Sequence, residues 1–168
     1  MIMAIGFRDV RSEDSTMITR WKREPYIKKM ALGPDEDIKE EDEAEEIKKY
    51  VEGEKEGEYK IIQVDKTGDI GYIRVDWMDS RKSVAWLRFV IGEHRGEGYG
   101  RKSLKKFTDD LFNRGCVRIE AEVYRDNIPS QMVLEKVGFK REGIKRKAHF
   151  DGEDYIDIYV YGKIREDR

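Results

Sequence analysis

A glycine-rich stretch near the middle of the chain, HRGEGYGRK (residues 94–102), has the residue types and spacing of a ligand-binding loop. Its glycines and flanking arginines are Gly96, Gly98, Gly100, Arg95 and Arg101. The apolar run VAWLRFVI (84–91) precedes it and an amphipathic segment follows it, so the stretch connects a buried strand to a helix. The first turn of a helix offers unpaired N–H groups and a partial positive charge, and glycine lets a phosphate approach that backbone closely. We therefore expect a phosphate-bearing ligand; the alternative is a plain strand-to-helix turn with solvated arginines.

Two common nucleotide-binding motifs do not fit this stretch. A Walker A loop ends in Gly-Lys-Ser/Thr, which is missing. A Rossmann fingerprint requires Gly or Ala where Arg101 stands, and it belongs near the start of a sheet, whereas this stretch follows the fourth predicted strand. What remains is the pattern Arg-x-x-Gly-x-Gly, from Arg95 to Gly100.

The composition narrows the class of protein. The 168 residues are expected to form one domain, residues 1–168, around one core. Charged residues make up 42% of the chain, but the net charge is only −2, so no basic field indicates bulk nucleic-acid binding. Cys116 is the only cysteine, and His94 and His149 are the only histidines, which argues against a metal site built from thiols or imidazoles. The first residues include no long apolar run, so we expect no signal peptide, no membrane span and a cytoplasmic location.

The elements that must position the glycine stretch follow from hydrophobic periodicity. Strands are predicted at residues 5–10, 59–64, 70–76, 84–91, 117–124, 139–147 and 155–162. Helices are predicted after a cap at Ser12 or Asp14, over residues 37–52, between the glycine stretch and Gly115, and from Pro129 to Gly138. In the last helix, Met132, Val133 and Val137 are expected to face inward. The 84–91 run is apolar almost throughout, so it should be central in the sheet of an α/β (α+β) domain.

A second stretch, NIPSQMVLEKVGFKREG (127–143), makes a family resemblance specific. It resembles the second signature of the GNAT superfamily of N-acetyltransferases, in which Asn-x-x-Ser is followed by a short helix and Glu-Lys-x-Gly-Phe. The Arg95–Gly100 pattern resembles the acyl-CoA pyrophosphate loop of the same family, and the two motifs have the family's order and spacing. The tail, HFDGEDYIDIYVYGKIRE, is similar to the branch that contains ribosomal-protein N-terminal acetyltransferases and spermidine acetyltransferases. The resemblance implies a GNAT fold, a mixed and mostly antiparallel twisted sheet of about seven strands flanked by about four helices, with a central splayed parallel pair.

The resemblance also implies a site for acetyl-CoA where the parallel strands 84–91 and 117–124 splay apart. A bulge in the first strand would leave backbone N–H groups free to pair with the pantetheine arm, and the N–H of Val90 or Ile91 would polarise the thioester carbonyl. The implied cofactor-binding residues are Phe89, Val90, Ile91, Arg95, Gly96, Glu97, Gly98, Tyr99, Gly100, Arg101, Asn127 and Ser130. The structural alternatives are core packing for the strand residues and helix capping for Asn127 and Ser130.

The chemistry implied by the resemblance is attack of a neutral primary amine on a thioester. Many relatives carry a Tyr in the short helix as general acid, but Leu134 occupies that position here and cannot donate a proton. The matching Ser has been assigned the acid role in the ribosomal-protein branch, so the resemblance implies Ser130 as the candidate catalytic acid. The alternative is that Ser130 donates a hydrogen bond to the sulfur, because a hydroxyl is a poor acid at its free pKa. Glu122 is the first candidate for the base and Asp76 the second; the alternatives are that each is a surface carboxylate, or that a water relay serves.

An acidic run, EDIKEEDEAEE (36–46), falls where the family's acceptor-side helices lie. It would attract a cationic acceptor, although a solvated helix face balanced by nearby lysines is the favoured interpretation. The sequence thus predicts an N-acetyltransferase that moves an acetyl group from acetyl-CoA to a primary amine in a ternary complex. The amine would belong to a protein or peptide N-terminus, a polyamine or another small molecule. We expect a monomer or homodimer with no metal, no nucleic acid and no membrane partner.

Two alternatives to an enzyme remain at this point. A non-catalytic acyl-CoA-binding or regulatory module is favoured by Leu134, since it removes the family's acid. A phosphate- or nucleotide-binding regulator is favoured only if the 127–143 signature is accidental.

Overall fold

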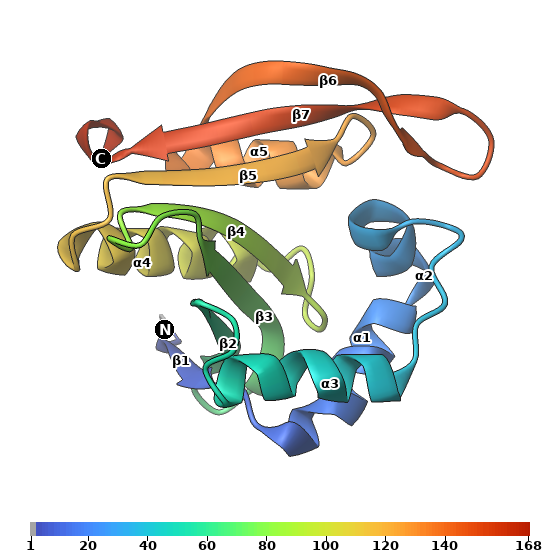
Figure 1. Cartoon of the computed structure of the whole chain (residues 1–168), viewed down its shortest axis with the longest axis horizontal. Coiled ribbons are helices and arrows are strands. Elements are labelled where there is room, and N and C mark those ends of the chain that lie inside the picture. Colours follow the sequence, from blue (N-terminus) through green and yellow to red (C-terminus); the bar gives the residue numbers. More distant parts are fainter. Residues whose placement is uncertain (1–2) are drawn as a thin grey trace.

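The computed structural model describes residues 3–168, which form a seven-stranded sheet with helices on both faces (Figure 1). The strands are β1 (Ile5–Asp9), β2 (Gly57–Val64), β3 (Gly68–Trp77), β4 (Val84–Ile91), β5 (Arg118–Tyr124), β6 (Lys140–Phe150) and β7 (Tyr155–Ile164). The helices are α1 (Ser15–Arg23), α2 (Pro25–Ile27), α3 (Glu40–Val51), α4 (Tyr99–Asn113) and α5 (Ile128–Val137). Short 3-10 turns occupy Ser12–Asp14 and Arg165–Asp167, and a π-helical turn, η2, occupies Lys28–Leu32.

The sheet has the strand order β1-β2-β3-β4-β5-β7-β6. Every neighbouring pair is antiparallel except β4 and β5. β4 is the fourth of the seven strands in that order, so the apolar 84–91 run forms the central strand, as its composition predicts. The predicted mixed fold with one central parallel pair is confirmed.

The parallel pair separates halfway along its length. Pairing joins only Val84–Trp86 to Arg118–Glu120, although β4 continues to Ile91 and β5 to Tyr124. Beyond Glu120, β5 keeps its pairing with β7 on its other side. Figure 1 shows β4 and β5 diverging toward the end at which β4 leads into the glycine stretch. In residues 87–91 of β4, the backbone groups that face β5 are therefore left without a strand partner.

Side chains alternate along the strands and build two cores, one on each face of the sheet. On one face, α4 and α5 bury Leu104, Phe107 and Leu134 against the sheet. On the other face, α1 and α3 contribute Ile18, Trp21 and Ile47 to a second cluster with strand residues that include Tyr59 and Tyr72. Full burial of each such apolar side chain stabilises the fold by about 1.5–3 kcal/mol.

The predicted strands agree with the structure to within three residues at either end. The helix predicted from Asp37 begins instead at Glu40, after an extended Lys39 that serves as its N-cap. Inward packing of Met132 is wrong, because its side chain is half exposed at 50% and the inward stripe of α5 runs through Gln131, Leu134 and Val137. The π-helical turn after Pro25 had no signal in the periodicity. Of the helices in residues 3–168, none has the length and apolarity needed to cross a membrane.

Candidate active site

The glycine stretch turns sharply between β4 and α4. Gly96 and Gly98 have φ angles of 82° and 84°, in the left-handed region, and Gly98 is the N-cap of α4. A Cβ on either residue would meet no protein atom within 4 Å, so the space beside them is open. A Cβ on Gly100 would lie 3.5 Å from Cγ1 of Ile91, an ordinary contact. Glycine is thus favoured at 96 and 98 by backbone conformation, and the backbone of these two residues borders empty space.

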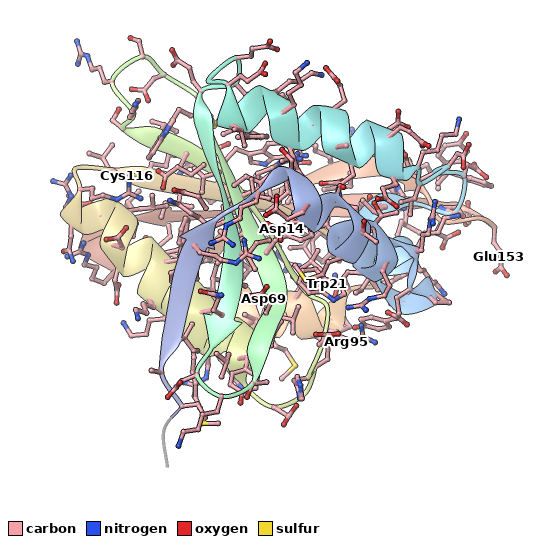
Figure 2. All side chains as sticks on the ribbon, turned by 90° about the horizontal axis from the view of Figure 1, so that it is seen from below. Asp14, Trp21, Asp69, Arg95, Cys116 and Glu153 are labelled. Carbon is pink, nitrogen blue, oxygen red and sulfur yellow. The ribbon has the colours of Figure 1, made fainter. Side chains whose placement is uncertain are left out.

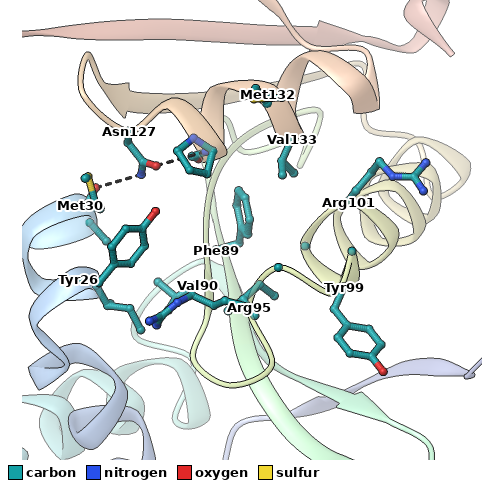
Figure 3. Close-up of a pocket in the computed structure, with 18 of the residues that line it drawn as sticks. Tyr26, Met30, Phe89, Val90, Arg95, Tyr99, Arg101, Asn127, Met132 and Val133 are labelled. Carbon is teal, nitrogen blue, oxygen red and sulfur yellow. Dashed lines mark hydrogen bonds between the residues drawn. The ribbon is translucent and has the colours of Figure 1, made fainter.

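A cavity of about 620 Å³ opens beside this turn, between β4, α5 and the segment from α2 to η2 (Figure 3). Most of the predicted cofactor-binding residues line it: Phe89, Val90, Ile91, Arg95, Gly96, Gly98, Tyr99, Gly100, Arg101, Asn127 and Ser130. Glu97 does not line it, and its carboxylate lies 3.0 Å from Nδ1 of His94. The volume suits a drug-sized or cofactor-sized ligand.

One wall of this first cavity was missed from the sequence. It comes from α2 and η2, through Tyr26, Ile27, Met30 and Ala31. Asn127 and Tyr124 hold this wall: Nδ2 of Asn127 donates to the carbonyl of Met30 at 3.3 Å, and the hydroxyl of Tyr124 donates to that of Leu32 at 2.7 Å. The only local signal was Pro25, which indicated a break and not a wall.

The two arginines of the stretch differ in their surroundings. The guanidinium of Arg95 lies over the ring of Tyr26, 4.8 Å from its centroid, and donates to Glu24 at 2.8 Å. Arg95 therefore bridges from the loop to α2 across the cavity. Arg101 is exposed, and Figure 3 shows its side chain and that of Tyr99 directed away from the middle of the cavity.

The backbone of β4 alternates between its two neighbours. The carbonyl of Val84 accepts from the N–H of Met78 at 2.8 Å, and the N–H of Gly92 donates to the carbonyl of Ile70 at 2.7 Å. Even-numbered residues of β4 therefore turn their polar groups toward β3, so Val90 does so as well. Phe89 and Ile91 turn theirs toward the side that β5 has left. The predicted bulge is absent, because the β3–β4 register runs without a shift, and Ile91 replaces Val90 as the candidate among the two.

A second cavity of about 330 Å³ adjoins the first. The residues that line both are Met30, Ala31, Phe89, Val90, Asn127 and Ser130. Ser130 thus lies at the junction. Leu134, which is fully buried, lines the second cavity.

The candidate bases fall in different places. Glu122 lines the second cavity, and its partly exposed carboxylate forms an ion pair with Lys145. Asp76 lines neither cavity, and its carboxylate accepts a hydrogen bond from the hydroxyl of Tyr50. Burial raises the pKa of the Tyr50 hydroxyl, and that hydrogen bond raises it further. The fold therefore brings Ser130 and Glu122 to one cavity and leaves Asp76 outside it.

Asn127 has the structural role that its position before a helix predicts. Its Oδ1 accepts from the backbone N–H of Ser130 at 3.2 Å, which caps α5. The Ser130 hydroxyl takes no part in that cap, so it stays available to the cavities.

The acidic run from 36 to 46 turns two of its carboxylates inward. Glu43 is 5% exposed and pairs with Lys22 at 2.5 Å while accepting from the Tyr59 hydroxyl. Glu46 pairs with Lys55 and with Arg74. No residue of the run lines either cavity. These two acidic side chains neutralise buried cations and do not line a path to the site.

The comparisons with known proteins agree with this geometry. The family described as the Acetyltransferase (GNAT) domain matches residues 5–140. A relative from Bacillus licheniformis, uncharacterized N-acetyltransferase p20, is 24% identical over 167 residues, which are 97% of this chain and 94% of that protein.

Solved structures have the same fold. The spermidine N-acetyltransferase from Vibrio cholerae, in complex with CoA and spermine, aligns with a TM-score of 0.85 at 18% identity, over 97% of this chain and 96% of that one. The ribosomal-protein-S5-alanine acetyltransferase from Vibrio fischeri aligns with a TM-score of 0.80 at 18% identity, over 99% and 98%. Both branches named by the sequence resemblance are therefore among the structural neighbours. Since the family match spans most of the chain and the curated relatives are N-acetyltransferases, this chain belongs to the GNAT acetyltransferase family and is an N-acetyltransferase.

Proposed function

We propose that this enzyme binds acetyl-CoA in the first cavity and a primary amine in the second, and that the acetyl group passes directly between them in a ternary complex. The observation that carries the proposal is the junction of the two cavities at Ser130 and Phe89, where β4 and β5 part. A thioester at this junction would be open to attack from the second cavity.

The first cavity has the groups that coenzyme A requires. The N-terminus of α4, with the open backbone at Gly96 and Gly98, would hold the pyrophosphate. Arg95 lines the same cavity, and its guanidinium has N–H donors beyond the one that Glu24 accepts. The N–H groups of Phe89 and Ile91 would pair with the pantetheine arm, and one of them would donate to the thioester carbonyl as negative charge develops on its oxygen.

The reaction forms one bond and breaks one. The amine nitrogen attacks the carbonyl carbon, the carbon–sulfur bond breaks, and the amine proton is transferred so that an amide and free CoA thiol result. Ser130 would donate a hydrogen bond to the departing sulfur. Glu122, or a water held by it, would accept the amine proton. Asp76 stays the second candidate and would act only through a water relay, because it lines neither cavity.

The acceptor belongs to one of three classes: a protein or peptide N-terminus, a polyamine or another small amine. The spermine complex and the ribosomal-protein acetyltransferase support the first two by family likeness. The enzyme would work as a monomer or homodimer.

Substitution of Gly98 tests the site of the pyrophosphate. A Cβ at Gly98 meets no protein atom within 4 Å, so Gly98→Ala changes the space left for a ligand. We expect CoA to bind about tenfold more weakly by calorimetry, which corresponds to about 1.4 kcal/mol. Gly53→Ala is the matched control, because Gly53 has a φ of 75° and an equally open side but lies just after α3. Both variants carry similar left-handed strain of about 1 kcal/mol. Equal CoA affinity in the two variants would assign the pyrophosphate to another part of the surface.

Thiol release tests the chemistry. The protein is mixed with acetyl-CoA and a panel of peptides, polyamines and amino acids, and free thiol is followed over time. Acceptor-dependent thiol supports transfer. Binding of acetyl-CoA without it supports the non-catalytic module, for which the buried Leu134 in place of the family's Tyr is the argument.

A further inference from the structure

The second cavity has an uneven distribution of charge. Three basic side chains line it, Lys22 from α1, Arg74 from β3 and Arg88 from β4. The only carboxylate among its lining residues, which all lie in the described chain, is Glu122, on β5. The basic groups therefore lie on the side of α1, β3 and β4, and the acidic group lies on β5.

Two of the basic groups are fixed and nearly buried. Lys22 pairs with Glu43 at 2.5 Å, with side-chain exposures of 14% and 5%. Arg74 has a side chain 8% exposed, contacts Glu46 at 3.4 Å, and has an Nε without a hydrogen-bond partner. Burial lowers the pKa of Lys22, but Tyr72 and Glu43 outweigh that effect and the net shift is upward, so Lys22 remains cationic.

Arg88 is the third basic group, and it differs from the other two. Its guanidinium lies over the ring of Trp86, 3.8 Å from the centroid, and the ring holds it in orientation. Lys22, Arg74 and Glu122 each have an oppositely charged partner, whereas Arg88 forms no ion pair with any residue from 3 to 168. It adjoins Phe89, at the junction of the cavities.

The register places Arg88 beside a second arginine. Arg88 lies directly opposite Arg74 in the β3–β4 ladder. Like charges at opposed positions of neighbouring strands destabilise a sheet. Glu46 already offsets part of this repulsion at Arg74, and an anion bound at Arg88 would offset the rest and supply hydrogen-bond acceptors to its planar donor group, which suits a carboxylate.

From these contacts we infer that the acceptor is a small zwitterion, with a carboxylate that binds Arg88 and a primary amine that faces Glu122 and Ser130. The inference rests on the proposed transfer function and specifies its substrate class. A cavity of about 330 Å³ accommodates a molecule of amino-acid size. A polyamine would bring further positive charge beside Arg88, because Glu43 and Glu46 of the acidic run already pair with Lys22 and Arg74 and line neither cavity.

Matched pairs of amines test the inference. The L-amino acids with primary amines are compared with their α-carboxamides in the thiol-release assay, with spermidine as a third arm. Amidation lowers the pKa of the amine, so it favours the neutral nucleophile; a preference for the free acid therefore reports recognition of the carboxylate. We expect kcat/KM of the best acid to exceed that of its amide by about tenfold to a hundredfold, the range for a charged hydrogen bond.

The variant Arg88→Gln should reduce that ratio to near one while leaving CoA affinity unchanged. Arg141→Gln is the matched control, because Arg141 is an exposed arginine that also lies over an aromatic ring, Tyr159 at 4.6 Å, but lines neither cavity. It should retain the full acid preference. Faster reaction of the amides or of spermidine, or an acid preference that survives in R88Q, would overturn the inference.

A binding measurement separates this failure from failure of the proposed function. The same acids and amides are titrated calorimetrically into protein saturated with CoA. If no amine is acetylated but the acid binds the wild type more tightly than R88Q, transfer fails and the carboxylate subsite stands. If acetylation proceeds and the acid and amide bind and react alike, the subsite is wrong and transfer stands. If no amine reacts and no acid binds more tightly than its amide, both are wrong.

Discussion

Ser130 is the one hydroxyl residue among the described residues that line both cavities. Its backbone N–H is bonded to Asn127, while its side chain is free of that cap. A thiolate that leaves a thioester carries negative charge, and a donor aimed at it stabilises the transition state more than the ground state. The residue's value thus lies in its hydroxyl and not in helix stability.

Ser130→Ala should lower kcat by about 10–100-fold, in the range for loss of one transition-state donor or a weak acid. The thermal midpoint and CoA affinity should stay close to wild type, because the cap uses the backbone. Ser130→Thr, which retains the hydroxyl, should recover part of the loss. A full-rate S130A variant would remove Ser130 from the reaction.

At the scale of elements, α1 packs closely against the residue that follows β4, just before the glycine stretch. Trp21 is 2% exposed and its ring lies against Gly92, the residue directly after β4. A Cβ on Gly92 would lie 2.3 Å from Cγ of Trp21, far inside any real contact. The absence of a Cβ at Gly92 therefore allows α1 to pack this closely against the start of the loop.

Gly92→Ala should destabilise the fold by about 1–3 kcal/mol, the usual cost of overpacking, as measured by urea unfolding. It should also weaken CoA binding, because relief of the clash must move either α1 or the start of the loop. Gly6→Ala in β1 is the control, since a Cβ there meets nothing within 4 Å and should be nearly neutral. Wild-type stability in G92A would mean that Trp21 can shift without cost.

At the scale of the whole molecule, a charged network joins the first strand, the first turn and the sheet. Arg8 donates to both carboxylate oxygens of Asp14 at 2.8 Å and to Asp69 at 2.8 Å. Figure 2 shows Asp14 and Asp69 on this side of the sheet. Burial raises the pKa of Asp14, but hydrogen bonds from Arg8 and from the N–H of Arg11 outweigh it, and the net shift is downward.

A carboxyl whose pKa is depressed in the folded state contributes stability above its unfolded pKa and loses it as pH falls through the folded pKa. The free energy of unfolding should therefore decrease as pH falls below about 4. Asp14→Asn should lower the free energy of unfolding by about 2 kcal/mol at pH 7, which is less than the loss for a fully buried pair. At pH 2 the same substitution should lower it by much less. Asp65→Asn, at an exposed position that forms no ion pair with residues 3–168, should shift neither value. A pH-independent difference between D14N and wild type would assign the loss to packing.

Much of this fold could be read from local patterns. The limits of β4, the turn at Gly96 and Gly98, and the helix that follows depend on side-chain period and on backbone angles that glycine favours, and both are properties of neighbouring residues. The helix cap at Asn127 is the structural alternative that residue type alone offered, since Asn favours helix N-termini. These features need no knowledge of distant partners.

The tertiary structure decided what depends on pairing between distant segments. Register against β3, and not residue type, turns the N–H groups of Phe89 and Ile91 toward the cavity in place of that of Val90. Strand position puts Glu122 on the second cavity and leaves Asp76 outside it. The basic wall of Lys22, Arg74 and Arg88 joins residues from one helix and two strands, far apart in the chain. Periodicity reports which way a side chain faces within its own element, but the charge of a cavity is a sum over elements that meet only when the chain has folded.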